Sequence, residues 1–295
     1  MRSPRARFAA ALFAVASLLA FPAGAERYTH GLLFEIKRDG APASYVFGTL
    51  HSSDPRVVDL PSPVRDAFGH ARRLAVESVL GEAQASTFLE QAQYTDAHRL
   101  SDDFDAATVD RIREALGTLA PSATVFERLK PWAILLLLSR PRGEDGTPAL
   151  DQQLVSEART RHMLVLGLEL PEEQASAFDA IPIESQVALV RYALDRRETV
   201  LADQERALRA WRDRDLEGLA VLLREPGRRD AKLAPHLAEL KRHLIDDRSA
   251  LMAHRLFLPL REGRIFVAVG ALHLYGDRGL LALIAEQGYR VRRLY

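Results

Sequence analysis

Residues 266–273 read Phe-Val-Ala-Val-Gly-Ala-Leu-His, an apolar run that stops at a glycine and is followed three residues later by a histidine. A short valine-rich run predicts a β-strand buried on both faces, and Gly270 marks a point where the backbone can turn or be closely approached. The same order of features occurs near the start of the chain, where residues 43–47 precede Gly48-Thr49-Leu50-His51. The chain therefore contains two predicted strands that each end in Gly-x-x-His.

The two histidines that follow these strands, His51 and His273, are candidate metal ligands. A lone histidine after a strand is more often a structural residue than a ligand. Two copies at equivalent places favour a functional site, because open α/β sheets bind their ligands at the carboxyl ends of their strands. We expect folding to bring both imidazoles, together with a nearby acid, to face a common cavity.

Two acidic residues mirror the two histidines. Glu77 interrupts the apolar strand 74–79, and Glu169 closes the apolar run 163–168. A carboxylate at such a place is seldom buried without a partner, so either it is solvated at the tip of the strand or it faces the same site as the histidines. We favour the second reading, with Glu77 as a metal ligand or catalytic base and Glu169 as a reserve carboxylate.

An arginine after two aspartates, Arg248, is a further candidate catalytic residue. Beside a reacting group its guanidinium could stabilise a developing oxyanion, and beside a carboxylate it could simply form an ion pair. The histidines at positions 236, 243 and 254 lie in helical patterns without a preceding strand or glycine turn, and we expect them to be surface or packing residues.

The remaining pattern predicts an α/β fold with a central mixed sheet, flanked by helices and carrying large helical insertions. Asp39-Gly40 between two β-leaning runs indicates an opening hairpin. Helical patterns fill residues 84–138 and 172–261, and 264–295 reads as a strand, glycine turn, helix and strand. Within the first insertion, residues 131–138 start with proline and are otherwise entirely apolar, which predicts a helix buried in the interior. Asp151 is expected to cap the helix that follows.

The first 25 residues have the pattern of an export signal. Three arginines are followed by an apolar stretch over residues 8–21 and by Ala23-Gly24-Ala25, small residues of the kind that precede a cleavage site. We expect cleavage before Glu26, a mature domain over residues 26–295 and a periplasmic location. A retained membrane anchor is the less favoured alternative, because a span needs about 20 apolar residues.

Charge and cysteine content exclude several classes of function. Without residues 1–25, which hold three of the 40 basic residues and none of the 40 acidic ones, the net charge is −3. Nucleic-acid binding, which would call for a basic face, is not expected. The chain has no cysteine, so disulfides, thiol nucleophiles and cysteine-based zinc sites are excluded. No Gly-x-Ser-x-Gly motif is present either, which argues against a serine hydrolase of the nucleophile-elbow type.

Several of these motifs together resemble the TraB/GumN family, which includes the TIKI-type metalloproteases and looks related to the erythromycin-esterase and ChaN-like superfamily. The shared features run in the same order over nearly all of the mature chain: Gly48-Thr49-Leu50-His51, the strand glutamate Glu77, Leu129-Lys130-Pro131-Trp132, Asp151-Gln152-Gln153-Leu154, Gly167-Leu168-Glu169 with Glu173-Gln174, Val269-Gly270-Ala271-Leu272-His273, and Gly288-Tyr289. Two positions depart from the family's usual pattern, which has asparagine where this chain has Ser249 and threonine where it has Leu170.

The resemblance implies an α/β fold with a helical insertion. For the TIKI branch it also implies metal-dependent peptide hydrolysis that relies on His51, His273 and Glu77. Two imidazoles and a carboxylate would leave an open position on a divalent ion such as zinc, manganese or cobalt. The leading hypothesis is therefore a periplasmic metal-dependent hydrolase that acts on a peptide or protein substrate, with no stable membrane anchor after signal cleavage.

A non-catalytic binding protein is the alternative. The resemblance allows it, because the TraB branch is associated with shutting off peptide pheromones and ChaN-like proteins bind haem. Histidines in a cleft could serve to sequester a peptide or haem without turnover. A third reading, in which the histidines only cap strand ends through hydrogen bonds, would make the protein a structural α/β domain.

Overall fold

The fold was analysed in a computed structural model of the chain, which describes residues 27–79, 82–140 and 147–295. The predicted signal peptide lies outside these residues. Within them, no helix has both the length and the apolar character needed to cross a bilayer.

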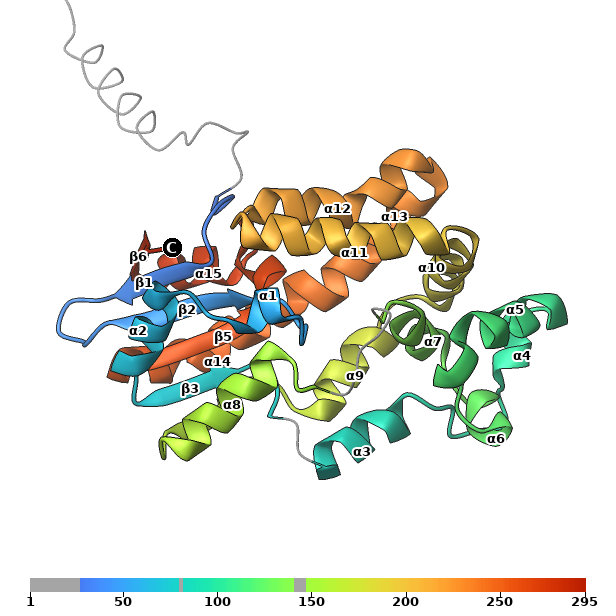
Figure 1. The fold of residues 1–295 in the computed structure, drawn as a ribbon, viewed down its shortest axis with the longest axis horizontal. Coiled ribbons are helices and arrows are strands. Elements are labelled where there is room, and N and C mark those ends of the chain that lie inside the picture. The colour runs from blue at the N-terminus through green and yellow to red at the C-terminus, as the bar shows by residue number, and fades with distance from the viewer. Residues whose placement is uncertain (1–26, 80–81, 141–146) are drawn as a thin grey trace, which may run out of the picture.

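Six strands of the described chain form one mixed sheet in the order β4-β3-β5-β2-β1-β6 (Figure 1). Their bounds are β1 Leu33–Lys37, β2 Ser44–Thr49, β3 Arg73–Val76, β4 Leu164–Gly167, β5 Ile265–Gly270 and β6 Arg290–Arg293. β1 pairs antiparallel with β2 and with β6, and the predicted hairpin turns at Gly40, whose positive φ of 80° suits glycine. β2, β5, β3 and β4 are parallel neighbours. The expected α/β fold with a central mixed sheet is confirmed.

Helices connect these strands and also build a separate lobe. The helices near the sheet are α1 Pro55–Val58, α2 Ser62–His70, α8 Leu150–Thr160, the short η4 Ala271–Leu274 and α15 Leu280–Glu286. The first insertion contains α3 Glu82–Gln91, α4 Leu100–Asp103, α5 Ala106–Leu116, η1 Gly117–Leu119, α6 Ala123–Phe126 and α7 Pro131–Leu138. The second contains α9 Pro171–Asp179, α10 Ile183–Asp195, α11 Arg197–Arg212, α12 Leu216–Arg229, η2 Ala231–Leu233, α13 Ala234–Lys241, a π-helical segment Arg242–Asp247 and α14 Arg248–Glu262. Figure 1 shows the sheet at one end of the molecule and α4 to α7 at the other.

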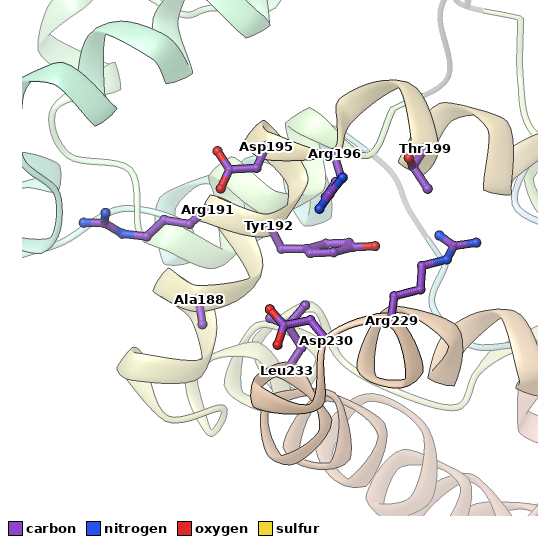
Figure 2. Close-up of a pocket in the computed structure, with 9 residues that line it drawn as sticks. All are labelled: Ala188, Arg191, Tyr192, Asp195, Arg196, Thr199, Arg229, Asp230 and Leu233. Carbon is purple, nitrogen blue, oxygen red and sulfur yellow. The ribbon is translucent and has the colours of Figure 1, made fainter.

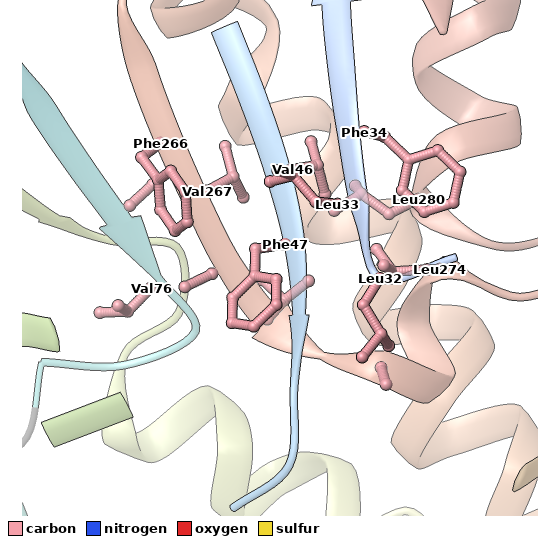
Figure 3. Packing of buried hydrophobic residues seen from close by; sticks show 14 of the residues in the cluster. Leu32, Leu33, Phe34, Val46, Phe47, Val76, Phe266, Val267, Leu274 and Leu280 are labelled. Atoms are coloured by element: carbon pink, nitrogen blue, oxygen red, sulfur yellow. The ribbon is translucent and has the colours of Figure 1, made fainter. Parts of the chain in front are cut away.

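The sheet and the helical lobe each have an apolar core of their own. The larger one packs around the sheet, where β5 is buried on both faces as its sequence predicted. Phe47 of β2 lies beside Phe266 of β5, with ring centroids 6.0 Å apart (Figure 3). The smaller cluster fills the helical lobe around Trp132, which stacks on Phe178. The site described below belongs to the sheet and not to the lobe.

Two expectations about burial are wrong. The apolar run 163–168 has the composition of a buried strand, but β4 is the edge of the sheet and Leu164 is 58% exposed. An apolar run predicts a strand without saying which neighbours it finds, and β4 pairs with β3 only. Helix α7 is likewise not buried all round: Trp132 and Ile134 are buried, whereas Leu136 is 37% exposed, because one side of the helix faces outward from the lobe.

Candidate active site at the carboxyl edge of the sheet

Parallel pairing brings four chain segments to one edge of the sheet. The strands β4, β3, β5 and β2 are adjacent and parallel, so their carboxyl ends point the same way. Glu77 follows β3 directly, Glu169 follows β4, His51 follows β2, and His273 lies in η4 directly after β5. All four residues predicted from the sequence are thus at the edge where α/β sheets gather their chemistry.

Arg248 bridges the two acidic residues. Its Nη2 donates to Glu77 Oε2 at 2.6 Å and to Glu169 Oε2 at 2.7 Å, and its Nε donates to Glu169 Oε1 at 2.9 Å. The Glu169 side chain is 0% exposed and that of Arg248 is 13% exposed. Burial alone would lower the pKa of Arg248, but Glu169 and Glu77 outweigh it and raise the pKa above its ordinary value. With both carboxylates ionised the three groups carry a net charge of −1.

The second oxygen of Glu77 faces β5 and η4. Glu77 Oε1 accepts a hydrogen bond from the Gly270 amide at 2.7 Å and lies 3.6 Å from His273 Nε2. Burial would raise the pKa of Glu77, but the imidazole of His273, the guanidinium of Arg248 and the Gly270 amide together lower it from 4.5 to about 2. Glu77 is therefore an anion at neutral pH, and its side chain keeps 24% exposure.

His273 is buried beside this carboxylate. It is 3% exposed, and its burial lowers its pKa below the ordinary value even though Glu77 pulls the pKa upward. Its ring is therefore neutral at neutral pH. On the other side of the ring, Nδ1 lies 2.9 Å from Oγ of the buried Ser249.

His51 has a different partner. Its Nδ1 lies 3.4 Å from Oδ2 of Asp151, whose Oδ1 accepts the hydroxyl of Thr49 at 2.7 Å. The His51 side chain is 71% exposed, so it sits at the outer rim of the edge rather than among the buried groups. A carboxylate behind Nδ1 is the arrangement that orients the imidazole of a metal ligand and leaves Nε2 available.

The sequence of the chain also matches a known protein family. The sequence profile described as the TraB/PrgY/gumN family matches residues 32–293. The chain belongs to this family. The expected resemblance is thereby confirmed, and the matched region contains all of the edge residues described above.

Two relatives are distant but extend over most of the chain. The metalloprotease TIKI1 of Danio rerio is 24% identical over 311 aligned residues, which cover 89% of this chain and 63% of that protein. This chain thus spans less than two thirds of the length of TIKI1. The uncharacterised protein YbaP of Shigella flexneri is 24% identical over 250 residues, which cover 83% of this chain and 89% of YbaP. No solved structure matches.

Similarity to a metalloprotease raises the question of a metal ion. Across residues 27–79, 82–140 and 147–295, no group of three or more histidines and acidic residues is arranged to hold one. Glu77 and His273 do form a pair of candidate ligands. Two ligand atoms bound to the same tetrahedral zinc ion are about 3.4 Å apart, and Glu77 Oε1 lies 3.6 Å from His273 Nε2. The pair fits two positions of a divalent ion, whereas His51 lies against Asp151 at the exposed rim of the edge.

Sequence reasoning found most of this edge and missed two of its residues. Asp151 is not the helix cap that was expected: the N-cap of α8 is Ala149, and the Asp151 carboxylate instead bonds Thr49 and approaches His51. The shared Asp151-Gln152-Gln153-Leu154 motif was the available signal. Ser249 was noted only as a departure from the family pattern, yet it contacts His273. The roles assigned to His51, His273, Glu77, Glu169 and Arg248 remain predictions.

A separate cavity lies in the helical lobe. It has a volume of about 850 Å³ and is lined by residues of α10, α11 and the end of α12, among them Tyr192, Arg196 and Arg229 (Figure 2). Much of its charge is already paired, as in the contact of Arg229 with Glu225 at 2.7 Å. None of the edge residues lines it, so the candidate site rests on its chemistry rather than on the size of a hollow.

Proposed function

We propose that this family member is an exported, metal-dependent hydrolase that cleaves peptide bonds at the carboxyl edge of its sheet. The observation that carries the proposal is the pairing of an ionised, half-buried Glu77 with a neutral, buried His273 at 3.6 Å. An oxygen and a nitrogen donor in these protonation states are what a divalent ion requires. Similarity to a metalloprotease over 89% of the chain supports the same reaction class.

In this proposal Glu77 and His273 hold the ion, and His51 supplies a further ligand from the rim. A bound divalent ion would lower the pKa of a bound water and polarise a peptide carbonyl. Glu77, which is the more exposed of the two acids, is also placed to accept a proton from an attacking water. Glu169 is fully enclosed and binds Arg248 through both oxygens, so its part is to hold that guanidinium in place.

Arg248 has two roles in the proposed hydrolysis. It lies against Glu77 and keeps that carboxylate ionised, which suits a metal ligand, although the same lowering of the pKa makes Glu77 a weaker base. A guanidinium this close to the reacting groups would also stabilise negative charge on a substrate carbonyl oxygen. The ion pairs with Glu77 and Glu169 favour the first part in the resting protein.

The test is metal binding followed by peptide cleavage. Protein purified with added zinc is expected to carry the ion, the double variant His51→Ala, His273→Ala is expected to lose it, and a matched control with two exposed histidines replaced, His70→Ala, His254→Ala, is expected to retain it. Cleavage of a peptide library should follow the same order. Equal zinc content in all three proteins would remove the proposal.

Location is tested separately. The export segment over residues 1–25 supports a periplasmic location in the bacterial cell. The exported protein is expected to begin at Glu26 when its N-terminus is sequenced. An N-terminus at Met1 in a membrane fraction would instead favour a retained anchor.

A binding protein is the second candidate, and one observation favours it. Arg248 occupies an oxygen of Glu77 and both oxygens of Glu169, which leaves few carboxylate positions for a metal. A protein that sequesters a peptide or haem through His273 would not need them. Haem added to the protein would then shift its Soret band in a manner lost in His273→Ala, and a peptide library would be recovered bound and intact.

A further inference from the structure

The cavity of the helical lobe contains two charged side chains without an ionic partner. Five charged residues line this cavity. Three of them are ion-paired: Arg191 with Asp105 at 3.2 Å, Asp195 with Arg111 at 2.6 Å, and Arg229 with Glu225 at 2.7 Å. The other two, Arg196 and Asp230, form an ion pair neither with each other nor with any other residue of the described ranges. One unpaired cation and one unpaired anion therefore share a cavity of about 850 Å³.

We propose that this cavity binds a zwitterion, either a free amino acid or a short peptide with unblocked ends, with the ligand carboxylate at Arg196 and the ligand ammonium group at Asp230. An arginine presents a planar set of donors that matches a carboxylate, and an aspartate accepts hydrogen bonds from an ammonium group. The inference goes beyond the proposed hydrolysis, because binding in the lobe needs neither a metal ion nor the cleavage of a bond.

The two charges stand on different walls of the cavity. Figure 2 shows the Arg196 side chain on one side of the Tyr192 ring and the Asp230 carboxylate on the other, with Leu233 next to Asp230. The wall between the charges is thus aromatic and aliphatic. An amino acid or a short peptide presents the same succession of groups, since a carbon skeleton separates its two charged ends. Pockets for small ligands usually have volumes of about 300–1,000 Å³, so this cavity is large enough.

Both charged residues are held at helix ends. Arg196 follows α10, and its amide donates to the Tyr192 carbonyl at 2.9 Å. Asp230 follows α12, and its amide donates to the Pro226 carbonyl at 2.9 Å. The Asp230 Oδ1 atom accepts from the Lys232 amide at 3.0 Å, which orients the carboxylate and leaves Oδ2 for a ligand. Residues already in place before binding lose less conformational entropy when a ligand arrives.

Solvent limits the strength of this site. Arg196 and Asp230 are both exposed at the cavity, so a ligand charge that meets either of them forms a solvated ion pair. Such a pair strengthens binding by about 2- to 5-fold. Removing one ligand charge should therefore weaken binding by that factor, and removing both should multiply the two losses.

The test titrates the dipeptide Leu-Leu into the ¹⁵N-labelled, metal-free protein and follows the amide signals of α10 and η2 by NMR. Leu-Leu is expected to bind. N-acetyl-Leu-Leu and Leu-Leu amide, which each lack one charge, are expected to bind about 2- to 5-fold more weakly. Free leucine in place of Leu-Leu decides between an amino acid and a peptide as the ligand. These comparisons use the native protein, so they do not depend on the folding of any variant.

Two variants assign the ends of the ligand. Arg196→Gln should remove the difference in affinity between Leu-Leu and Leu-Leu amide. Asp230→Asn, which keeps an oxygen for the Lys232 amide, should remove the difference between Leu-Leu and N-acetyl-Leu-Leu. Arg191→Gln is the matched control, because Arg191 lines the same cavity but is paired with Asp105, and it should leave both differences in place.

The inference would be overturned by blocked and unblocked peptides that bind equally, or by differences in affinity that persist in Arg196→Gln and Asp230→Asn. The absence of shifts at about 10 mM Leu-Leu, tenfold above the dissociation constant of a 1 mM site, would also overturn it. Binding that disappears in the double variant His51→Ala, His273→Ala would place the peptide at the edge of the sheet and count against the lobe. Peptide binding in the lobe without any uptake of zinc would refute the proposed hydrolase and leave this site intact.

Discussion

Removing the guanidinium that joins Glu77 and Glu169 should destabilise the fold strongly. In Arg248→Met the aliphatic stem is kept and the charge is lost. The two acidic side chains lie within 2.7 Å of the same Nη2 atom, so without it two carboxylates are left close together. Glu169 has no exposed side-chain area and cannot turn to water. The site thus loses its only bridging cation among the described residues.

The size of the effect follows from this burial. Removing one partner of a buried ion pair costs about 3–5 kcal/mol of unfolding free energy. The loss of unfolding free energy does not exceed this range, because one of the two carboxyl groups can take up a proton instead of remaining charged. Its folded-state pKa would then lie above the unfolded value, so the variant loses stability as the pH rises from acid to neutral. The deficit relative to the native protein should be largest at neutral pH.

The assay is urea unfolding at neutral pH, with the slope against urea compared between proteins to exclude a change of the unfolded state. Arg255→Met is the matched control, because Arg255 lies on the same helix and pairs with Glu173 at 2.6 Å, with both side chains about one third exposed. An exposed pair contributes about 0–1 kcal/mol. A loss in Arg248→Met no larger than in the control would refute the argument, as would a deficit that shrinks with rising pH.

Three further outcomes are expected. The lowering of the Glu77 pKa from 4.5 to about 2 stabilises the fold by about 3 kcal/mol above pH 4.5, and this stabilisation is lost as the pH falls through about 2. In Glu77→Gln the curve of unfolding free energy against pH should therefore be flatter between these two values. An unchanged curve would contradict the low pKa of Glu77. In Gly48→Ala the new Cβ would lie 2.8 Å from a Leu274 methyl and 3.0 Å from the backbone of η4, and this clash should destabilise the fold by about 1–3 kcal/mol. In the control Gly69→Ala the new Cβ meets nothing within 4 Å, and the change should stabilise α2 by about 0.5–1 kcal/mol. Melting temperatures that shift in the same direction in both variants would argue against this packing. Trp132→Ala should lower the free energy of unfolding by about 3–5 kcal/mol, because the ring is 1% exposed and its Nε1 donates to Asp179 at 2.7 Å. A loss below about 1 kcal/mol in thermal unfolding would mean that the helical lobe is loosely packed.

The sequence alone determined the elements and the edge on which the chemistry gathers. Strand 266–270 is a run of valine and other apolar residues that ends at Gly270. Such a run is either a strand enclosed on both faces or a turn of a buried helix, and its short length and terminal glycine favour the strand. Because parallel strands share the direction of their carboxyl ends, Glu77, Glu169 and His273 could be expected at one edge before their neighbours were known. The family resemblance added the order of the motifs.

Only the tertiary structure decided which atoms meet at that edge. The contact of Arg248 with Glu77 joins positions 171 residues apart. Whether Arg248 meets the two acids or a substrate oxygen depends on where α14 packs, and no local periodicity of the sequence encodes that position. The position of β4 at the border of the sheet was equally open, since an apolar run carries no record of its second neighbour. The contacts of Asp151 and Ser249 were open for the same reason: a polar side chain finds its partner through packing in three dimensions, and neither the family motif around Asp151 nor the helical pattern around Ser249 names that partner.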